Sequence, residues 1–171
     1  MALHIVQYSP EIPQNTGNIM RTCAASGVNL HFIKPIGFSL DEKSIKRSGA
    51  NYGSEVVYSV YENWDEFKEK NKSGNFYFCT TYGQKNYSEI DFTNSDEDHF
   101  IIVGGESVGI SKDILVENYE RCFRVPMTDK TTTLNVSNIA AIMIYEAMRQ
   151  QEFSGLCKKI PQDKINEIFS K

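Results

Sequence analysis

Polar side chains that could bind a ligand gather in three separate stretches of the 171-residue chain. The first stretch holds Asn15, Asn18 and Arg21, and a spacing of three residues puts Asn18 and Arg21 on one face of a helix. An arginine there could grip a phosphate or a carboxylate through two parallel hydrogen bonds. A solvated arginine is the simpler interpretation of Arg21 when it is considered alone.

The second stretch is the sequence GGESVG, in which Gly104, Gly105 and Gly109 surround Glu106 directly after an apolar segment. Glycines at such a place permit close approach of the backbone to a ligand, or they serve a tight turn. The sequence leaves both interpretations open. The pattern is neither GxGxxG after a first strand nor GxxxxGK[ST], which disfavours nicotinamide and nucleoside-triphosphate chemistry.

The third stretch consists of an apolar strand ended by Pro126, a threonine-rich loop, and a long apolar helix beginning at Val136. Hydroxyls and a carboxylate directly before an apolar run are typical of a helix start. This loop therefore either caps the helix, or holds a ligand together with the free amides of the first helical turn.

Predicted strands alternate with predicted helices along the chain. The strands are expected at residues 3–8, 30–34, 55–60, 75–80, 99–103 and 122–125, with a short strand or turn near residue 90. The helices are expected from Asn15 or Thr16 to Gly27, over 41–49, 62–72 and 111–117, and from 136 onward. After Phe153 the chain forms either a last helix through Ile165 or a frayed end. The alternation predicts an α/β fold, a mostly parallel sheet with helices on both faces. Ligands in such folds bind beyond the carboxyl ends of the strands, which selects the loops 9–16, 104–111 and 127–135.

The composition, 40% hydrophobic and 23% charged residues, predicts one globular domain over residues 1–171. A net charge of −4 is unusual for a protein that binds nucleic acid without a specific site. An RNA partner would need a local basic patch, such as Lys43, Lys46 and Arg47, or a groove built by symmetry.

Other chemistries find little support in the sequence. The four cysteines lie far apart without a CxxC pair, which predicts no zinc or other metal site and thiols kept reduced in the cytoplasm. All three histidines fall in or at the start of predicted strands, where core or edge positions are commoner than catalytic bases. No serine lies in a nucleophile elbow, and neither a signal peptide nor a membrane-spanning run is expected.

Three segments, PEIPQNTGNIMR, IIVGGESVG and VPMTDKTTTLNVSNIAAIMIYEAMRQ, together resemble the three motifs of the SPOUT RNA 2'-O-ribose methyltransferases. The opening of the chain is most similar to the small branch of that family, whose members methylate the wobble nucleotide, cytidine or uridine 34, of tRNA. The resemblance implies a C-terminal trefoil knot, a homodimer, S-adenosylmethionine as cofactor, the tRNA anticodon stem-loop as substrate, and a cytoplasmic location.

The resemblance also implies roles for single residues. Arg21 matches the catalytic arginine, and the accompanying motif residues are Asn15, Glu106 and Asn135. Positions that match the methyl-donor site are Cys79, Gly104, Val125 and Thr133, with Leu134 adjacent.

This chain departs from the family pattern in two places. Val108 and Thr132 stand where the family usually has arginine, whereas Thr133 replaces a serine and keeps its hydroxyl. The missing arginines and the acidic charge motivate an alternative hypothesis, a dimeric RNA-binding or scaffold protein that keeps the fold without activity. A third hypothesis is an α/β enzyme that uses another nucleotide-like cofactor.

Overall fold

A seven-stranded parallel sheet forms the centre of the computed structural model, which describes residues 2–41, 56–94 and 96–169. The strand order is β3-β2-β1-β6-β4-β7-β5, and every pairing between these strands is parallel. Their bounds are β1 Leu3–Tyr8, β2 Asn29–Ile33, β3 Tyr58–Tyr61, β4 Asn75–Cys79, β5 Lys85–Asn86, β6 His99–Val103 and β7 Cys122–Arg124. The predicted mostly parallel sheet is confirmed.

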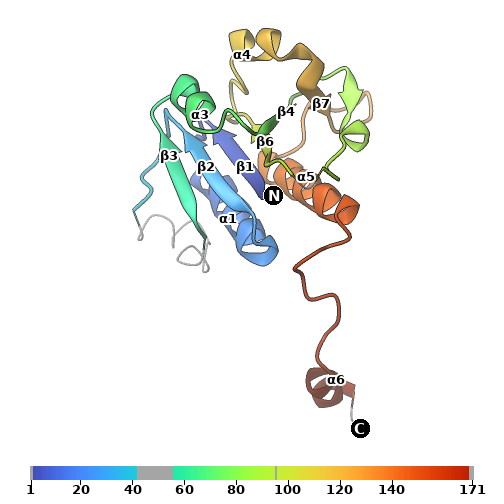
Figure 1. Ribbon diagram of the computed structural model, residues 1–171. Helices are drawn as coiled ribbons and strands as arrows, with labels where there is room; N and C mark the ends of the chain where they lie inside the picture. The colour runs from blue at the N-terminus through green and yellow to red at the C-terminus, as the bar shows by residue number, and fades with distance from the viewer. Residues whose placement is uncertain (1, 42–55, 95, 170–171) are drawn as a thin grey trace.

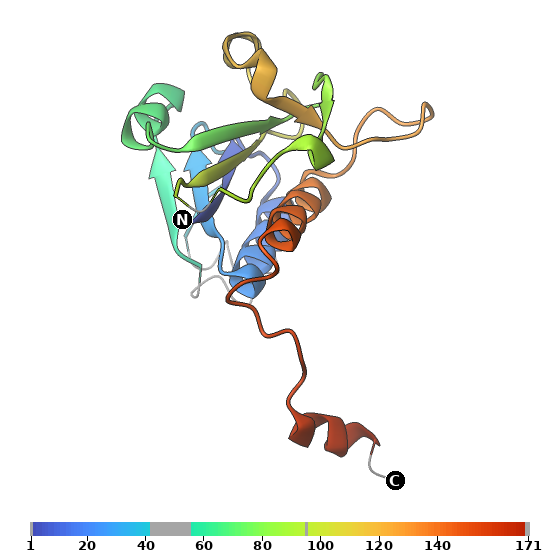
Figure 2. The ribbon, with the colours of Figure 1, turned by 45° about the vertical axis from the view of Figure 1, so that its right-hand side comes forward.

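Helices cover both faces of this sheet, as expected (Figures 1 and 2). On one face lie α1, Pro13–Ser26, and α5, Val136–Gln150, packed against each other. On the other face lie α3, Trp64–Lys70, and α4, Lys112–Glu117. Short 3-10 turns occupy Tyr87–Glu89 and Tyr119–Arg121, and α6 spans Gln162–Phe169.

An aliphatic core holds α1 and α5 against the sheet. Ile19 and Met20 of α1 and Met143 and Ile144 of α5 are completely buried in it. Burial of one such side chain stabilises a fold by roughly 1.5–3 kcal/mol, so this core fixes the place of both helices. Gly27 ends α1 as predicted, in the left-handed conformation with φ +73°, and its N–H donates to the carbonyl of Cys23.

An aromatic core lies on the opposite face, where Trp64 and Phe67 of α3 pack on Phe76 and Phe100 of the sheet. Asn63 caps α3 by accepting a hydrogen bond from the N–H of Glu66. Trp64 and Phe67 therefore anchor α3 to the sheet.

The three histidines are core residues, in agreement with the sequence interpretation. His4 and His31 lie side by side, with Nδ1 of His4 2.8 Å from Nε2 of His31, and Nδ1 of His31 is 3.1 Å from the hydroxyl of Tyr61. His99 is 1% exposed and its ring contacts Tyr77. Since all three are buried, general-base chemistry at a solvent-facing site is disfavoured for them.

Several predicted boundaries were wrong. Helix α1 begins at Pro13, so neither Asn15 nor Thr16 caps it; proline suits the first helical position because its missing N–H would have no partner there. Strand β7 ends at Arg124, which leaves Val125 outside the sheet, and β3 begins at Tyr58. By contrast, the short strand or turn expected near residue 90 is present, as β5 and the 3-10 turn that follows it.

Two further predictions have no test in this structure. The expected helix over 41–49, with its basic cluster, lies outside the described residues apart from its first position. The trefoil knot also stays a prediction.

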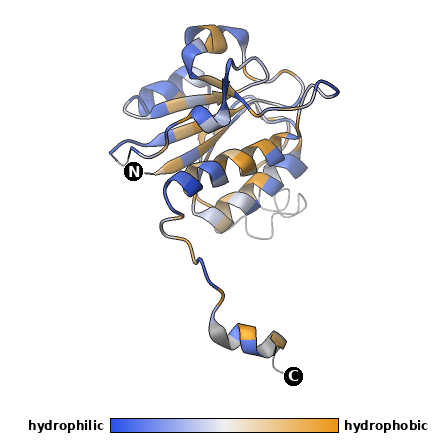
Figure 3. Ribbon diagram, turned by 90° about the vertical axis from the view of Figure 1, so that its right-hand side faces the viewer, coloured by the Kyte–Doolittle hydropathy of each residue, from blue (hydrophilic) through white to orange (hydrophobic). Residues whose placement is uncertain are grey.

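The C-terminal segment separates from the rest of the chain after α5. Figure 3 shows α1 and α5 side by side, with apolar residues along them, while α6 lies apart from the sheet in all three views. Phe153 and Leu156 still pack against the aliphatic core, whereas Ile160 is 65% exposed. The segment that follows Leu156 therefore adds little to the core that positions the site.

Candidate functional site

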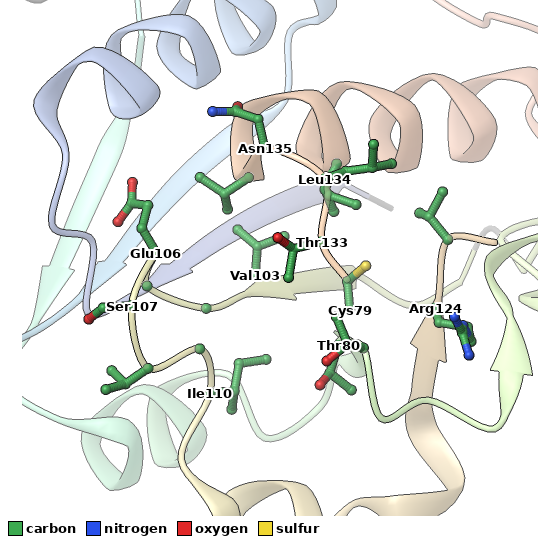
Figure 4. A pocket seen from close by; sticks show the side chains of 18 of the residues that line it. Cys79, Thr80, Val103, Glu106, Ser107, Ile110, Arg124, Thr133, Leu134 and Asn135 are labelled. Atoms are coloured by element: carbon green, nitrogen blue, oxygen red, sulfur yellow. The ribbon is translucent and has the colours of Figure 1, made fainter. Parts of the chain in front are cut away.

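A cavity of about 510 Å³ opens at the carboxyl ends of β1, β4, β6 and β7 (Figure 4). This is the edge at which parallel α/β sheets bind ligands. Four loops line it, those that follow β1, β4, β6 and β7, together with the first turn of α5. The lining residues are Ile12, Asn15, Cys79–Tyr82, Val103–Ile110, Arg124, Val125, Met127, Thr133–Val136 and Ile139.

The structure brings eight of the nine predicted site residues to this one cavity. The eight are Asn15, Glu106, Asn135, Cys79, Gly104, Val125, Thr133 and Leu134. Arg21 is the exception, because it lies on α1 two helical turns beyond Asn15, is exposed, and is not among the lining residues. The structure therefore joins the three motifs through Asn15.

A chain of hydrogen bonds connects the three motifs across the cavity wall. Nδ2 of Asn135 donates to Oδ1 of Asn15 at 2.9 Å, and Nδ2 of Asn15 donates to Oε1 of Glu106 at 2.8 Å. The second oxygen of Glu106 accepts the backbone N–H of Glu11 at 2.9 Å. Asn15 is only 7% exposed, so its amide is committed to these two partners.

Asn135 also begins α5, which explains why a polar residue stands before the apolar helix. Its Oδ1 accepts hydrogen bonds from the N–H of Ser137 at 2.9 Å and from the Ser137 hydroxyl at 2.6 Å. Its amide group therefore caps a helix on one side and holds Asn15 on the other. The capping interpretation of the threonine-rich loop is confirmed; the same loop also lines the cavity, and its binding of a ligand stays a prediction.

Glu11, which the sequence analysis did not single out, joins the first loop to the second. Its carboxylate accepts the N–H of Ser107 at 3.1 Å and the Ser107 hydroxyl at 2.7 and 2.8 Å. These hydrogen bonds lower the pKa of the Glu11 carboxyl, since they favour its charged form. Only the position of Glu11 between two loop prolines hinted at a role, and nothing in the sequence pointed to Ser107 as its partner.

The glycines of GGESVG serve the shape of the loop itself. Gly109 has φ +68°, a conformation that favours glycine, and its N–H donates to the carbonyl of Gly105 at 3.0 Å. A Cβ on Gly104 would lie 2.3 Å from the backbone of Gly109. Close approach at Gly104 is therefore to the protein's own loop, which supports the turn interpretation; close approach to a ligand stays a prediction.

Two further residues, Cys79 and Arg124, bear on the charge of the cavity lining. Burial raises the pKa of the Cys79 thiol to about 12, so this side chain stays neutral and contributes no thiolate. Arg124 is the only cationic side chain in the lining as described, and its Nε is buried without a hydrogen-bond partner. The sequence analysis missed Arg124, although a residue that ends a strand at the carboxyl edge is a natural candidate.

Metal and membrane chemistry have no counterpart in the part of the chain that the structure describes. No group of three or more histidine, cysteine, aspartate or glutamate side chains is placed to hold a metal ion there. Within the same residues, no helix has the length and apolar character needed to cross a bilayer.

Known proteins resemble this chain over most of its length. A relative from Geobacillus stearothermophilus, provisionally named as a tRNA (cytidine(34)-2'-O)-methyltransferase, is 48% identical over 156 residues, 91% of this chain and 99% of the relative. The tRNA (cytidine(34)-2'-O)-methyltransferase of Saccharophagus degradans is 37% identical over 153 residues, 89% of this chain and 97% of the relative.

Solved structures confirm the fold. The crystal structure of an RNA methyltransferase from Bacillus anthracis, itself provisionally assigned, superimposes with a TM-score of 0.89 at 48% identity, over 93% of this chain and all of that one. A structure described as giving insights into 2-OH methylation of C/U34 on tRNA has a TM-score of 0.80 at 31% identity, over 89% and 97%. The family model described as SpoU rRNA Methylase matches residues 2–145. The protein thus belongs to the SpoU rRNA methylase family.

Proposed function

We propose that this protein is an S-adenosylmethionine-dependent methyltransferase that modifies the ribose 2'-oxygen of the wobble nucleotide, cytidine or uridine 34, in the tRNA anticodon stem-loop. The observation that carries the proposal is the hydrogen-bond chain through Asn135, Asn15 and Glu106, which unites three remote loops around one cavity. The names of the relatives from Geobacillus and Saccharophagus support the choice of substrate.

The cavity fits a methyl donor of this size and chemistry. Its volume of about 510 Å³ lies in the range of small-molecule sites, and apolar side chains such as Ile110, Leu134 and Ile139 line it beside polar ones. The donor carries a carboxylate, and Arg124 offers a cationic side chain for it. The backbone at Cys79, Gly104 and Val125, with Thr133 and Leu134, would hold the remainder of the donor.

In the proposed mechanism the residues of this chain orient the acceptor and assist the loss of its proton. When bound, S-adenosylmethionine supplies an electrophilic methyl group. Asn15 and Asn135 keep Glu106 at the edge of the cavity, where its carboxylate can receive a hydrogen bond from the acceptor ribose. The guanidinium of Arg21 carries only hydrogen-bond donors and is not a base, so its proposed role is to grip a phosphate and to stabilise developing negative charge on the 2'-oxygen.

For Arg21 to contact a nucleotide bound at this cavity, the RNA strand must pass over α1. A homodimer supplies such a path if α1 of one subunit lies beside the cavity of the other, which is the arrangement we propose for a single-domain chain of 171 residues acting in the cytoplasm. The aromatic side chain of Tyr145 on α5, which is 44% exposed, supports an interface at this helix.

Mass-spectrometric mapping of ribose methylation in tRNA from cells with and without the gene tests the substrate. The proposal expects loss of the 2'-O-methyl group at position 34 only. In vitro, Arg21→Ala should abolish transfer while the dissociation constant for S-adenosylmethionine stays nearly unchanged, and Arg149→Ala, an exposed arginine on α5, is the matched control. Turnover that persists in Arg21→Ala would remove this arginine from the mechanism.

Isothermal titration with S-adenosylmethionine separates the proposal from its rival, an inactive RNA-binding or scaffold dimer. The enzyme must bind the donor stoichiometrically, whereas the scaffold need not bind it at all. A protein that neither binds the donor nor methylates tRNA would support the scaffold hypothesis.

A further inference from the structure

A second cavity, of about 400 Å³, lies next to the donor cavity. It is bounded by the end of β1, by the loop that follows β2, and by the far side of the GGESVG loop. The lining residues are Tyr8, Ser9, Glu11, Pro35, Ile36, Gly37, Ser107, Val108, Gly109 and Ser111.

The two cavities share one wall, because Ser107, Val108 and Gly109 line both of them. Glu11 fixes this wall through its hydrogen bonds to Ser107, and the Gly105 carbonyl accepts the N–H of Gly109. A ligand in the second cavity is therefore separated from the donor cavity by the thickness of one loop.

The chemistry of the lining selects the kind of ligand. Among these residues the one charged side chain is Glu11, a carboxylate, so a phosphate would meet repulsion and no cation. The rest combine an aromatic ring, Tyr8, with apolar Pro35, Ile36 and Val108 and with the hydroxyls of three serines. Apolar and aromatic walls with a few hydroxyl donors and acceptors suit a flat, neutral heterocycle.

We propose that the second cavity receives the base of the nucleotide that is methylated, so that its ribose lies at the shared wall and its 2'-oxygen faces the donor cavity. This inference rests on the proposed function and deepens it by assigning the acceptor's place. It requires the base to leave the anticodon stack, which is inexpensive for a nucleotide in a single-stranded loop.

A cavity-filling variant tests this assignment. Ser111 lines the second cavity but not the first, and its hydroxyl does not cap α4, so Ser111→Tyr fills the proposed base site without touching the donor site. Val116→Tyr introduces the same side chain on α4 at a position that is 66% exposed and lines neither cavity, which makes it the matched control. The substrates are an anticodon stem-loop with cytidine 34 and the same stem-loop with an abasic ribose, 2'-hydroxyl retained, at position 34.

The expected result has three parts. Wild-type protein shows a KM for the abasic stem-loop that is about tenfold or more above that for the parent, because the contacts to the base are lost. Ser111→Tyr raises the KM for the parent to a similar extent but leaves the KM for the abasic stem-loop nearly unchanged. Val116→Tyr behaves as wild type, and all three proteins bind S-adenosylmethionine with equal affinity, which shows that Ser111→Tyr is folded.

Two outcomes would overturn the inference. The first is equal KM values of wild-type protein for the parent and abasic stem-loops; the second is a Ser111→Tyr variant that handles the parent normally or that loses both substrates to the same degree. If wild-type protein transfers no methyl group to the parent stem-loop, the proposed function itself fails and this inference falls with it. That failure is distinct, because it appears before any variant or abasic substrate is used.

Discussion

The Nδ2 atom of Asn15 lies 2.8 Å from Oε1 of Glu106, although 91 residues separate the two along the chain. Asn15 is buried, and its carbonyl oxygen accepts the amide of Asn135, so an amide is the group that serves one acceptor and one donor here. A carboxylate at position 15 would lose the donor and face Glu106 with like charge.

We therefore expect Asn15→Asp to lower the free energy of unfolding by about 1–3 kcal/mol and to weaken donor binding. Urea denaturation and isothermal titration measure the two effects. Asn18→Asp, an exposed change on the same helix, should leave both nearly unchanged. Equal stability of the two variants would contradict the importance of the Asn15 amide.

Gly104 offers a test of the loop that separates the two cavities. A Cβ at this position would meet the backbone of Gly109 and Ile110 at 2.3–2.6 Å, so Gly104→Ala must displace the loop. Overpacking of this kind costs about 1–3 kcal/mol, and here it should also raise the dissociation constant of the donor.

Gly27→Ala is the control for Gly104→Ala. Gly27 also resists substitution, with φ +73°, but a Cβ there has open space and the residue lies outside both cavities. It should cost about 1 kcal/mol in stability through backbone strain alone and leave donor affinity intact. Identical donor affinity in Gly104→Ala would show that the loop adapts to the added methyl group.

Glu11 should act on the site through Ser107. In Glu11→Gln the side chain keeps its shape but loses the charge that two Ser107 donors favour, so donor binding should weaken, and Ser107→Ala should weaken it in the same direction. The double variant should be little worse than either single one, because both remove the same contact. If the losses in donor affinity measured by isothermal titration were fully additive, Glu11 would not act through Ser107.

The same pair predicts a pH dependence of known sign. Hydrogen bonds from Ser107 hold the pKa of the Glu11 carboxyl below its ordinary value. The stabilisation that the Glu11–Ser107 contact gives to the folded protein is therefore present above the pKa of Glu11 in the unfolded chain, and it is lost as pH falls through the pKa of Glu11 in the folded protein. Wild-type donor affinity should decline in that acidic range, whereas Glu11→Gln should lack this decline.

The buried histidine pair should also make the free energy of unfolding depend on pH, in a range above that of the Glu11 carboxyl. Burial, with a smaller effect of neighbouring His4, lowers the pKa of His31 to about 4, against ~6.5 in an unfolded chain. Between these values the unfolded state binds the extra proton, so stability rises with pH and is lost as pH falls. By pH 5 the loss should reach about 2 kcal/mol from His31 alone.

Chemical denaturation at about pH 7.5 and 5 measures this loss, and His31→Gln should reduce the difference between the two. Burial also lowers the pKa of His4, so part of the difference should remain in the variant. Nε2 of His4 lies 3.7 Å from Oδ2 of Asp98, beyond hydrogen-bonding distance, and this carboxylate opposes the effect of burial only in part. If the stability difference between the two pH values were as large in His31→Gln as in the wild-type protein, the acid sensitivity would not come from His31.

Sequence patterns predicted the fold well where one periodicity dominated. The strand at 99–103, which is apolar after His99, and the helix beginning at Val136 have the predicted starts, because neither competes with another local structure. The start of α1 was misjudged because Asn15 is a common helix cap, and only tertiary contact with Glu106 reveals that its side chain is used elsewhere.

The candidate site was predictable as a set of loops but not as a set of contacts. The carboxyl-edge rule selected the three loops from the order of the elements, and all three line the cavity. The pairing of Glu11 with Ser107 spans 96 positions and leaves no periodic trace, so only coordinates disclose it. The exposed place of Arg21 outside the cavity also depends on how α1 is rotated against the sheet, which residue spacing alone does not determine.

The hydrogen bond from Asn135 to Asn15 ties the first tenth of the polypeptide to its last quarter. During synthesis the segment around Asn15 cannot form this contact until Asn135 and α5 have left the ribosome. Contacts of such long sequence separation form slowly. A truncated translation product that stops before α5 would lack one side of the donor cavity and one end of this tie. Binding of the proposed methyl donor is thereby restricted to chains that extend into α5, and a fragment released earlier would be unable to compete for it.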